Sequence, residues 1–268
     1  MSIGSAKIRY ETPVRRLSKM AIDSWTAAVV LLWIPTILWC DRFATGRQQL
    51  FLGIATWSLL AGALRWQMPI VRIQAAVVVG FATVVEYSFS TGLHVYDYRL
   101  GHVPAYVPPG HGLVYLGALS LGHLVGRTSR PSRYVAAVVI LGAGYSTWGL
   151  VGTSRPDVLG AFWYLCLLAF LAFGRSRLLY LGAFVVVSYL EIIGTRWGVW
   201  TWAPRDPTGL VAIGNPPSGA AGGYGWFDLA AVFAAARLAP WLDIDTVGSP
   251  RFPLLSSTSR RKPPVASG

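Results

Sequence analysis

Long apolar stretches, separated by short polar segments, recur along the whole chain. Eight of them can be distinguished, and most approach the ~20 residues that a helix needs to cross the hydrocarbon core of a bilayer. The pattern therefore predicts an all-α, polytopic integral membrane protein with about eight transmembrane helices. The expected spans are residues 22–40, 50–64, 75–95, 111–126, 134–152, 158–173, 178–195 and 223–241.

The amino-acid composition supports a membrane protein. Hydrophobic residues make up 54% of the chain and charged residues only 13%, about half of the ~25% that is typical of soluble domains. Cysteine is rare, and Cys40 and Cys166 fall at different predicted depths in the membrane. We therefore expect two apolar packing residues rather than a disulfide.

The distribution of basic residues predicts the orientation. With eight spans, both termini and the second, fourth and sixth loops share one side, which collects 16 of the 23 Lys and Arg residues. The positive-inside rule then places both termini in the cytoplasm of a protein of the cell membrane. Contact with anionic lipid head groups accounts for the net charge of +12. The sequence contains no basic-aromatic nucleic-acid-binding module, so a nucleic-acid partner is not predicted. The residues on this side are Lys7, Arg9, Arg15, Arg16, Lys19, Arg65, Arg72, Arg127, Arg130, Arg133, Arg175, Arg177, Arg251, Arg260, Arg261 and Lys262.

The two ends of the chain are expected to be cytoplasmic extensions. Residues 1–21 form a long charged region, and no small-x-small cleavage site follows the first apolar stretch. This indicates a retained first span rather than a cleaved signal peptide. Residues 243–268 are rich in Pro, Ser and Arg and are expected to be disordered. Between the extensions we expect two halves, residues 22–126 and 127–242.

An internal repeat relates these halves. The segment "EYSFSTGLHVYDYRLGHVPAYVPPGHGLVY" starts at Glu86, and "EIIGTRWGVWTWAPRDPTGLVAIGNPPSGAAGGY" starts at Glu191, 105 residues later. Each runs from a glutamate within a predicted span through a glycine, an aromatic-x-aromatic triplet and a Pro-Pro pair to a tyrosine. Because both copies run from the cytoplasm to the exterior, the halves are predicted to be parallel four-helix repeats. The Pro-Pro pairs are expected to fix the angle at which the next helix enters the membrane.

Four titratable residues are predicted to form one catalytic site at the seam between the halves. Glu86 and Glu191 lie within spans, where a carboxyl is costly and usually faces a partner or a cavity. Such surroundings favour the neutral carboxyl, so we expect at least one of the two to hold a proton. His111 opens the fourth span and Asp228 lies one turn inside the eighth. Structural alternatives are an interhelical hydrogen bond for the glutamates, a cap or ion pair for Asp228, and contact with interfacial water for His111.

Aromatic residues gather near these candidates and are predicted to bind substrate. An ordinary aromatic belt at the level of the head groups is the alternative. Asn215 precedes the second Pro-Pro pair, where its amide can cap the following helix or donate into a site. The predicted substrate-binding residues are Tyr96, Tyr98, Tyr115, Trp197, Trp200, Trp202, Asn215 and Tyr224.

We predict neither a metal nor a cofactor. Four histidines are too few for a membrane di-iron hydroxylase, although a zinc ion held by His94, His102 or His111 with Glu86 is chemically possible. The chain contains no Ser-His-Asp pattern, Walker loop, GxGxxG, CxxC or DxxxD motif. ATP hydrolysis, hydride transfer and magnesium-dependent prenyl transfer are therefore not predicted.

The segment "EIIGTRWGVWTW" resembles the E-x-x-G-x-x-x-G, aromatic-x-aromatic segment of the carotenoid biosynthesis membrane hydratases, which include the bacterioruberin-type and C-1',2' hydratases. The matching positions are Glu191, Gly194, Gly198, Trp200 and Trp202. "EYSFSTGLHVYDY" fits the pattern more loosely. The family tends to have tyrosines at the two tryptophan positions, and the PPGHG element has no place in it. The resemblance implies a polytopic enzyme that hydrates an isoprenoid lipid without a metal or nucleotide cofactor.

Three functions from different classes follow from these features. The first is an enzyme in which a protonated carboxyl donates its proton to a C=C bond of an isoprenoid or other apolar lipid at the outer face of the membrane. The reaction would be a hydration, an isomerisation or a cyclisation. The second is a non-catalytic subunit or assembly factor of an envelope complex, with membrane-protein partners. The third is a lipid or small-molecule transporter, for which central acids in a parallel repeat are also expected, although spans 134–152 and 158–173 contain no charge.

Overall fold

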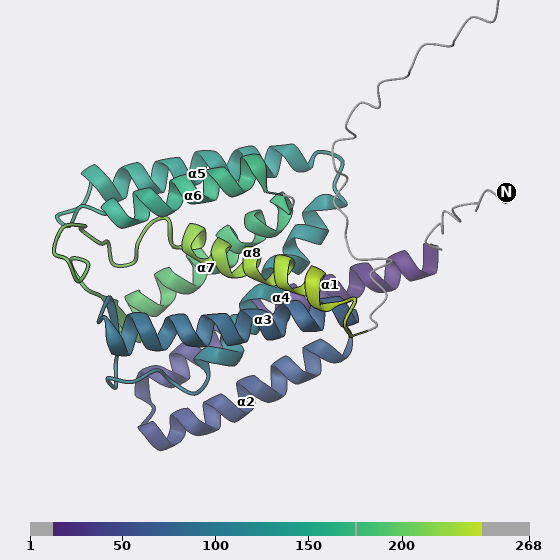
Figure 1. The fold of residues 1–268 in the computed structure, drawn as a ribbon, viewed down its shortest axis with the longest axis horizontal. Helices are drawn as coiled ribbons and strands as arrows, with labels where there is room; N and C mark the ends of the chain where they lie inside the picture. Colours follow the sequence, from purple (N-terminus) through teal and green to yellow (C-terminus); the bar gives the residue numbers. More distant parts are fainter. Residues whose placement is uncertain (1–12, 175, 243–268) are drawn as a thin grey trace, which may run out of the picture.

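The computed structural model describes residues 13–174 and 176–242 of the 268-residue chain. The predicted disordered tail and most of the predicted N-terminal cytoplasmic segment lie outside these residues. Within them the protein is all-α apart from a small two-stranded ribbon (Figure 1). The helices are α1 (Pro13–Phe43), α2 (Gly46–Arg65), α3 (Pro69–Glu86), α4 (Val107–Gly126), α5 (Pro131–Val151), α6 (Val158–Phe173), α7 (Arg177–Arg196) and α8 (Ala220–Leu238).

The predicted helical stretches are confirmed, since each of the eight coincides with one of these helices. Four helical segments are long and apolar enough to cross a membrane, and α6 is a shorter apolar helix. This indicates a multi-pass membrane protein. The four segments are Ser18–Phe43, Pro69–Gly92, Pro131–Val151 and Arg177–Arg196.

Local sequence explains where several helices begin. Proline occupies the first turn of α3, α4 and α5, where its missing N–H has no helical partner to lose. Thr45 and Gln48 form a capping box at the start of α2, and the Asp157 side chain caps α6 through the Gly160 N–H.

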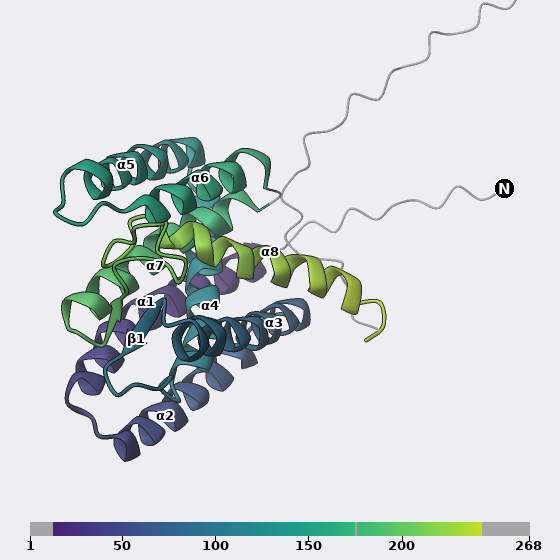
Figure 2. The same cartoon turned by 60° about the vertical axis from the view of Figure 1, so that its left-hand side comes forward.

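Helix α4 lies at the centre of the bundle and contacts α1, α2, α3 and α7. Figures 1 and 2 show α5 and α6 together at one edge of the molecule, α2 at the opposite edge, and α4 and α7 between them. Glycine lets α4 and α7 approach closely, because a Cβ atom at Gly182 would lie 2.0 Å from the Ala118 carbonyl oxygen. Across the bundle, α3 packs against α8.

Two short strands that the sequence pattern did not predict pair with each other, although they lie far apart in the sequence. Strand β1 (Tyr96–Tyr98) pairs with β2 (Trp200–Trp202) in antiparallel fashion, with Tyr96 opposite Trp202 and Tyr98 opposite Trp200. Side chains alternate between the faces of a strand, so all four aromatic rings lie on the buried face while the central residues are exposed. The ribbon therefore brings both aromatic-x-aromatic triplets to the same place.

Candidate functional site

A cavity of about 390 Å³ lies beneath the buried face of this ribbon. Its walls come from α1, α2, α3, α4, α6, α7 and α8 as well as from both strands. The lining is mainly aliphatic and aromatic, and it includes the carboxyl groups of Glu86 and Glu191 and the imidazole of His111. Its aromatic side chains are Trp33, Phe81, Phe89, Tyr96, Tyr98, Tyr106, Trp163, Trp200, Trp202, Tyr224, Trp226 and Phe227.

Glu86 is the last residue of α3 and is held on both carboxyl oxygens. The hydroxyls of Tyr96 and Tyr98 each donate to Oε2 at 2.8 Å, and His111 Nε2 lies 2.7 Å from Oε1. Burial, and after it the neighbouring Glu86 carboxyl, raise the pKa of both tyrosine hydroxyls well above their usual value. Both hydroxyls therefore keep their protons and act as donors.

The backbone changes its winding directly after Glu86. Residues Tyr87–Gly92 form a π-helical turn, η1, that continues α3. Such turns are rare and often occur at functional sites, because the extra residue per turn changes the direction of the side chains that follow. The turn leads the chain from α3 into β1, which carries the two tyrosines back onto Glu86.

Glu191, in α7, is held on one oxygen only. The indole N–H groups of Trp200 and Trp202 donate to Oε2 at 3.0 and 3.1 Å. Among the residues that the structure describes, none makes a hydrogen bond to Oε1. The Glu191 side chain is only 4% exposed and forms part of the cavity wall.

The aromatic-x-aromatic spacing now has a structural explanation. The first and third residues of a strand point to the same side, so both rings of a triplet can reach one carboxyl group. Tyr96 and Tyr98 donate hydrogen bonds to Glu86, and Trp200 and Trp202 donate hydrogen bonds to Glu191. Each glutamate is thus held by the triplet that follows it in sequence.

His111 lies in the first turns of α4, two residues after the Pro-Pro pair. Its ring stacks on Tyr224 of α8 at a centroid distance of 5.3 Å and meets Phe227 edge-on. Its Nδ1 atom is buried without a hydrogen-bond partner. The rigid turn therefore places the imidazole against Glu86 on one side and against α8 on the other.

Four of the predicted site residues lie outside the cavity lining. Asp228 is 4% exposed, and its Oδ2 has no partner. The Tyr115 hydroxyl donates to Gln74 at 2.9 Å. Trp197 packs on Trp39 at 5.4 Å.

The fourth of these residues, Asn215, contacts the backbone of β2 rather than the cavity. Its Oδ1 accepts a hydrogen bond from the Trp202 backbone N–H at 3.1 Å. It makes no side-chain cap at the start of α8, so the capping alternative is wrong. Asn215 instead positions β2, which in turn positions an indole donor of Glu191.

Several wall residues gave no indication in the sequence. The ring centroids of Trp163 in α6 and Trp202 lie 5.7 Å apart. Trp33 and Tyr106 also belong to the lining. Nothing in their local sequence differs from an ordinary apolar helix or loop. Over residues 13–174 and 176–242, no group of three or more His, Cys, Asp or Glu side chains is arranged to hold a metal ion.

Comparisons with protein-family models, curated proteins and solved structures find no match to this chain. The resemblance of the Glu191 segment to the carotenoid hydratases therefore remains a prediction. The chemistry of the cavity itself is the basis for a functional assignment.

Proposed function

We propose that this protein is a membrane enzyme that uses acid catalysis to hydrate or isomerise a C=C bond in an apolar lipid, such as an isoprenoid. One observation carries the proposal: Glu191 belongs to the wall of a largely aromatic cavity, and one of its carboxyl oxygens has no hydrogen-bond partner among the described residues. Apolar walls suit a hydrocarbon ligand, and a positioned acid is the group that an isolated alkene needs in order to react.

Glu191 is the general acid in this proposal. An indole N–H can only donate, so the two tryptophans both require Oε2 to be an acceptor. The proton of a neutral Glu191 therefore belongs on Oε1, the oxygen without a protein partner. From that position it can pass to a bound alkene.

Glu86 is the counter-charge to the carbocation that forms. It accepts hydrogen bonds from two tyrosine hydroxyls and contacts His111 Nε2, and a carboxylate accepts three donors better than a neutral carboxyl does. The faces of the surrounding aromatic rings also stabilise a cation. His111 is a positioning residue, since it acts through Glu86.

The reaction balances without an oxidant or reductant. In hydration, the Glu191 proton forms a C–H bond with one alkene carbon, and the oxygen of a water molecule bonds to the other. The water then releases a proton, which restores neutral Glu191. In isomerisation, a carbon next to the cation gives up a different proton to the Glu191 carboxylate, and the electrons of that C–H bond form the new double bond, which restores neutral Glu191.

The cavity has a side on which a lipid can enter. Phe81 of α3 and Trp226 of α8 line the cavity, yet they are 40% and 50% exposed at the surface of the bundle. Phe81 meets Phe227 edge-on at 5.3 Å, where α3 and α8 pack together. Exposed aromatic rings on membrane helices face hydrocarbon, so this side supports a substrate that arrives from the bilayer.

In this proposal all eight helices cross the membrane as two parallel halves, with both termini in the cytoplasm and the cavity towards the outer face. Helix packing supports two related halves, since α3 packs against α8 as α7 packs against α4. The two halves also share a pattern of contacts, since each glutamate accepts hydrogen bonds from the aromatic triplet that follows it in sequence.

Cysteine labelling tests the orientation. In a background with Cys40 and Cys166 replaced by Ala, we expect His102→Cys and Leu210→Cys to react with a membrane-impermeant maleimide in intact cells, because both residues are exposed in the predicted outer loops. Arg130→Cys, exposed in the α4–α5 loop, is the matched control and should react only after permeabilisation. The reverse pattern would overturn the orientation.

Lipid analysis tests the function itself. Extracts from cells with and without the protein, grown in oxygen-18 water, are compared by mass spectrometry. Hydration predicts a product heavier than its precursor by one molecule of labelled water, and isomerisation predicts an unchanged mass with a new retention time. If no lipid differs between the two strains, the enzyme proposal fails and the subunit hypothesis takes its place.

A further inference from the structure

A second group of buried polar side chains adjoins the cavity near its outer end. Asp41 and Gln49 lie on α1 and α2, and Arg99 and Tyr106 lie on the segment between β1 and α4. Asp41, Gln49 and Tyr106 are 0%, 2% and 4% exposed. We call these four residues the Asp41 cluster.

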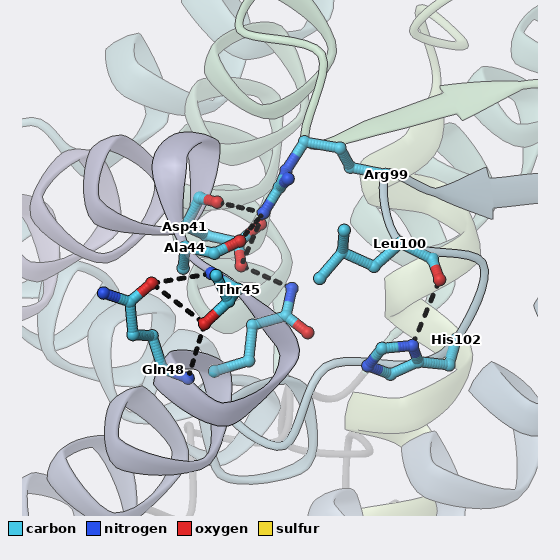
Figure 3. A network of polar contacts seen from close by, with 8 residues as sticks. Asp41, Ala44, Thr45, Gln48, Arg99, Leu100 and His102 are labelled. Carbon is cyan, nitrogen blue, oxygen red and sulfur yellow. Dashed lines mark hydrogen bonds and ion pairs between the residues drawn. The ribbon is translucent and has the colours of Figure 1, made fainter.

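Direct contacts hold the cluster together. Gln49 Nε2 donates to Asp41 Oδ1 at 2.6 Å, and an Arg99 Nη2 atom lies 3.9 Å from the same oxygen. Figure 3 shows the Arg99 guanidinium at the end of α1, where it donates to the carbonyl oxygens of Asp41 and Ala44. These contacts fix the position of every member except Tyr106.

Four atoms of the cluster nevertheless find no hydrogen-bond partner in the part of the chain that the structure describes. They are two acceptors, Asp41 Oδ2 and Gln49 Oε1, and two donors, Arg99 Nε and the Tyr106 hydroxyl. The Tyr106 hydroxyl lies beside the Asp41 carboxylate without the geometry of a direct hydrogen bond. Burial, and after it this carboxylate, raise the pKa of Tyr106 well above its usual value, so the hydroxyl keeps its proton.

The buried aspartate Asp157 shows the opposite situation. Asp157 accepts from the Gly160, Gly214 and Ser218 backbone N–H groups and from the Ser218 hydroxyl, at 2.6 to 2.9 Å. Both of its oxygens are used. Buried polar groups are normally satisfied by protein or by ordered water, and Asp157 is an example of the first case.

We propose that the Asp41 cluster is a binding site for ordered water that connects the outer surface with the cavity. The unpartnered atoms are two donors and two acceptors, and ordered water, which both donates and accepts hydrogen bonds, can satisfy groups of either kind. Arg99 keeps 25% of its side chain exposed, which gives access from outside. The Tyr106 side chain forms part of the cavity wall, which gives access to the interior.

This site also has a use that rests on the proposed function. Hydration consumes one water molecule per turnover, and a cavity with mainly apolar walls does not hold water well. A polar site behind Tyr106 can supply the nucleophile without making the cavity itself hydrophilic.

Radiolytic footprinting tests the site without any substrate. Hydroxyl radicals produced from bound water label the side chains next to it, so Tyr106 should be labelled much faster than Tyr180, which is similarly buried at 2% exposure and is not part of the cavity wall. Equal, slow labelling of both tyrosines would overturn the proposal, as would an experimental structure in which Tyr106 bonds directly to Asp41 or in which a lipid head group occupies the cluster.

Removal of one hydroxyl provides a second test. Tyr106→Phe keeps the ring that lines the cavity and should lower the Tm of the purified protein by about 2–4 °C, the shift that a single lost hydrogen bond gives in a chain of this size. Tyr134→Phe, at a residue that is 47% exposed, is the control and should leave the Tm unchanged. An unchanged or higher Tm for Tyr106→Phe would contradict the water site, because removing an unsatisfied buried hydroxyl costs nothing.

Whether the bound water also serves as the nucleophile of hydration can be tested separately from whether it binds. Tyr106→Phe should also slow oxygen-18 incorporation into the lipid product several-fold. If labelling and Tm respond as expected but incorporation does not, the supply role is wrong and the water is structural. If Glu191→Gln leaves turnover intact, the proposed function fails while the footprinting result stands.

Discussion

Glu191→Gln is expected to abolish turnover of the lipid while leaving the fold intact. Glutamine keeps an oxygen that accepts from the indoles of Trp200 and Trp202, but its amide cannot deliver an acidic proton to an alkene. Loss of a general acid typically lowers the rate by about 10²- to 10⁴-fold. The measurement is product formation in lipid extracts, together with expression level and Tm.

A catalytic role for Glu191 requires that product formation falls while the Tm stays unchanged. Gln74→Leu is a useful control, because it removes a half-buried polar partner of Tyr115 outside the cavity and should lower the Tm while the remaining folded protein stays active. If Glu191→Gln instead loses stability and activity in parallel, Glu191 is a structural hydrogen-bonding residue. Full activity in this variant would exclude it as the acid.

Asp157→Ala is expected to cause the largest loss of stability. The carboxylate anchors the loop before α8 to the start of α6 through Gly160, Gly214 and Ser218, and it is 2% exposed. Its removal leaves three buried backbone N–H groups and a hydroxyl without an acceptor, which we expect to cost about 3–5 kcal/mol. Thermal unfolding of the solubilised protein measures the effect.

Two further variants define the cause. Asp157→Asn keeps one acceptor oxygen but turns an NH₂ group towards donors, so its loss should be intermediate. Asp97→Ala is the exposed control, since Asp97 is 60% exposed and contacts only His94 by its side chain among the described residues. A Tm for Asp157→Ala close to that of Asp97→Ala would show that the loop is held by other contacts, such as the Arg155 hydrogen bonds to Trp202, Ala203 and Ile213.

The two buried glutamates of the cavity differ in how they are bound. Glu86 and Glu191 are similarly buried, at 5% and 4% exposure, and both are held by aromatic side chains from a strand. The difference lies in the number of oxygens used: Glu86 is bound on both, and Glu191 on one. This asymmetry is the reason that the proposed function gives different roles to two residues at equivalent places in the predicted repeat.

The sequence by itself determined the local features. The approximate positions of all eight helices follow from the apolar stretches, because an apolar run of this length in a bilayer must satisfy its backbone hydrogen bonds within the segment, as a helix does. The glutamates stand out because a charge in an apolar span is rare. The order of glutamate, aromatic triplet and Pro-Pro pair pointed to one place in each half, and His111, Glu86 and Glu191 do share a cavity.

Only the tertiary structure decided which residues meet. The pairing of Tyr96 with Trp202 joins positions 106 residues apart, and no local pattern encodes such a contact. Asp228 and Trp197 have the residue types of a site but face other parts of the bundle, whereas Trp163 and the Asp41 cluster gave no indication and adjoin the cavity. The physical reason is that helix packing depends on close approach at residues such as Gly182, and this approach sets the rotation of each helix and therefore the direction in which its polar side chains point.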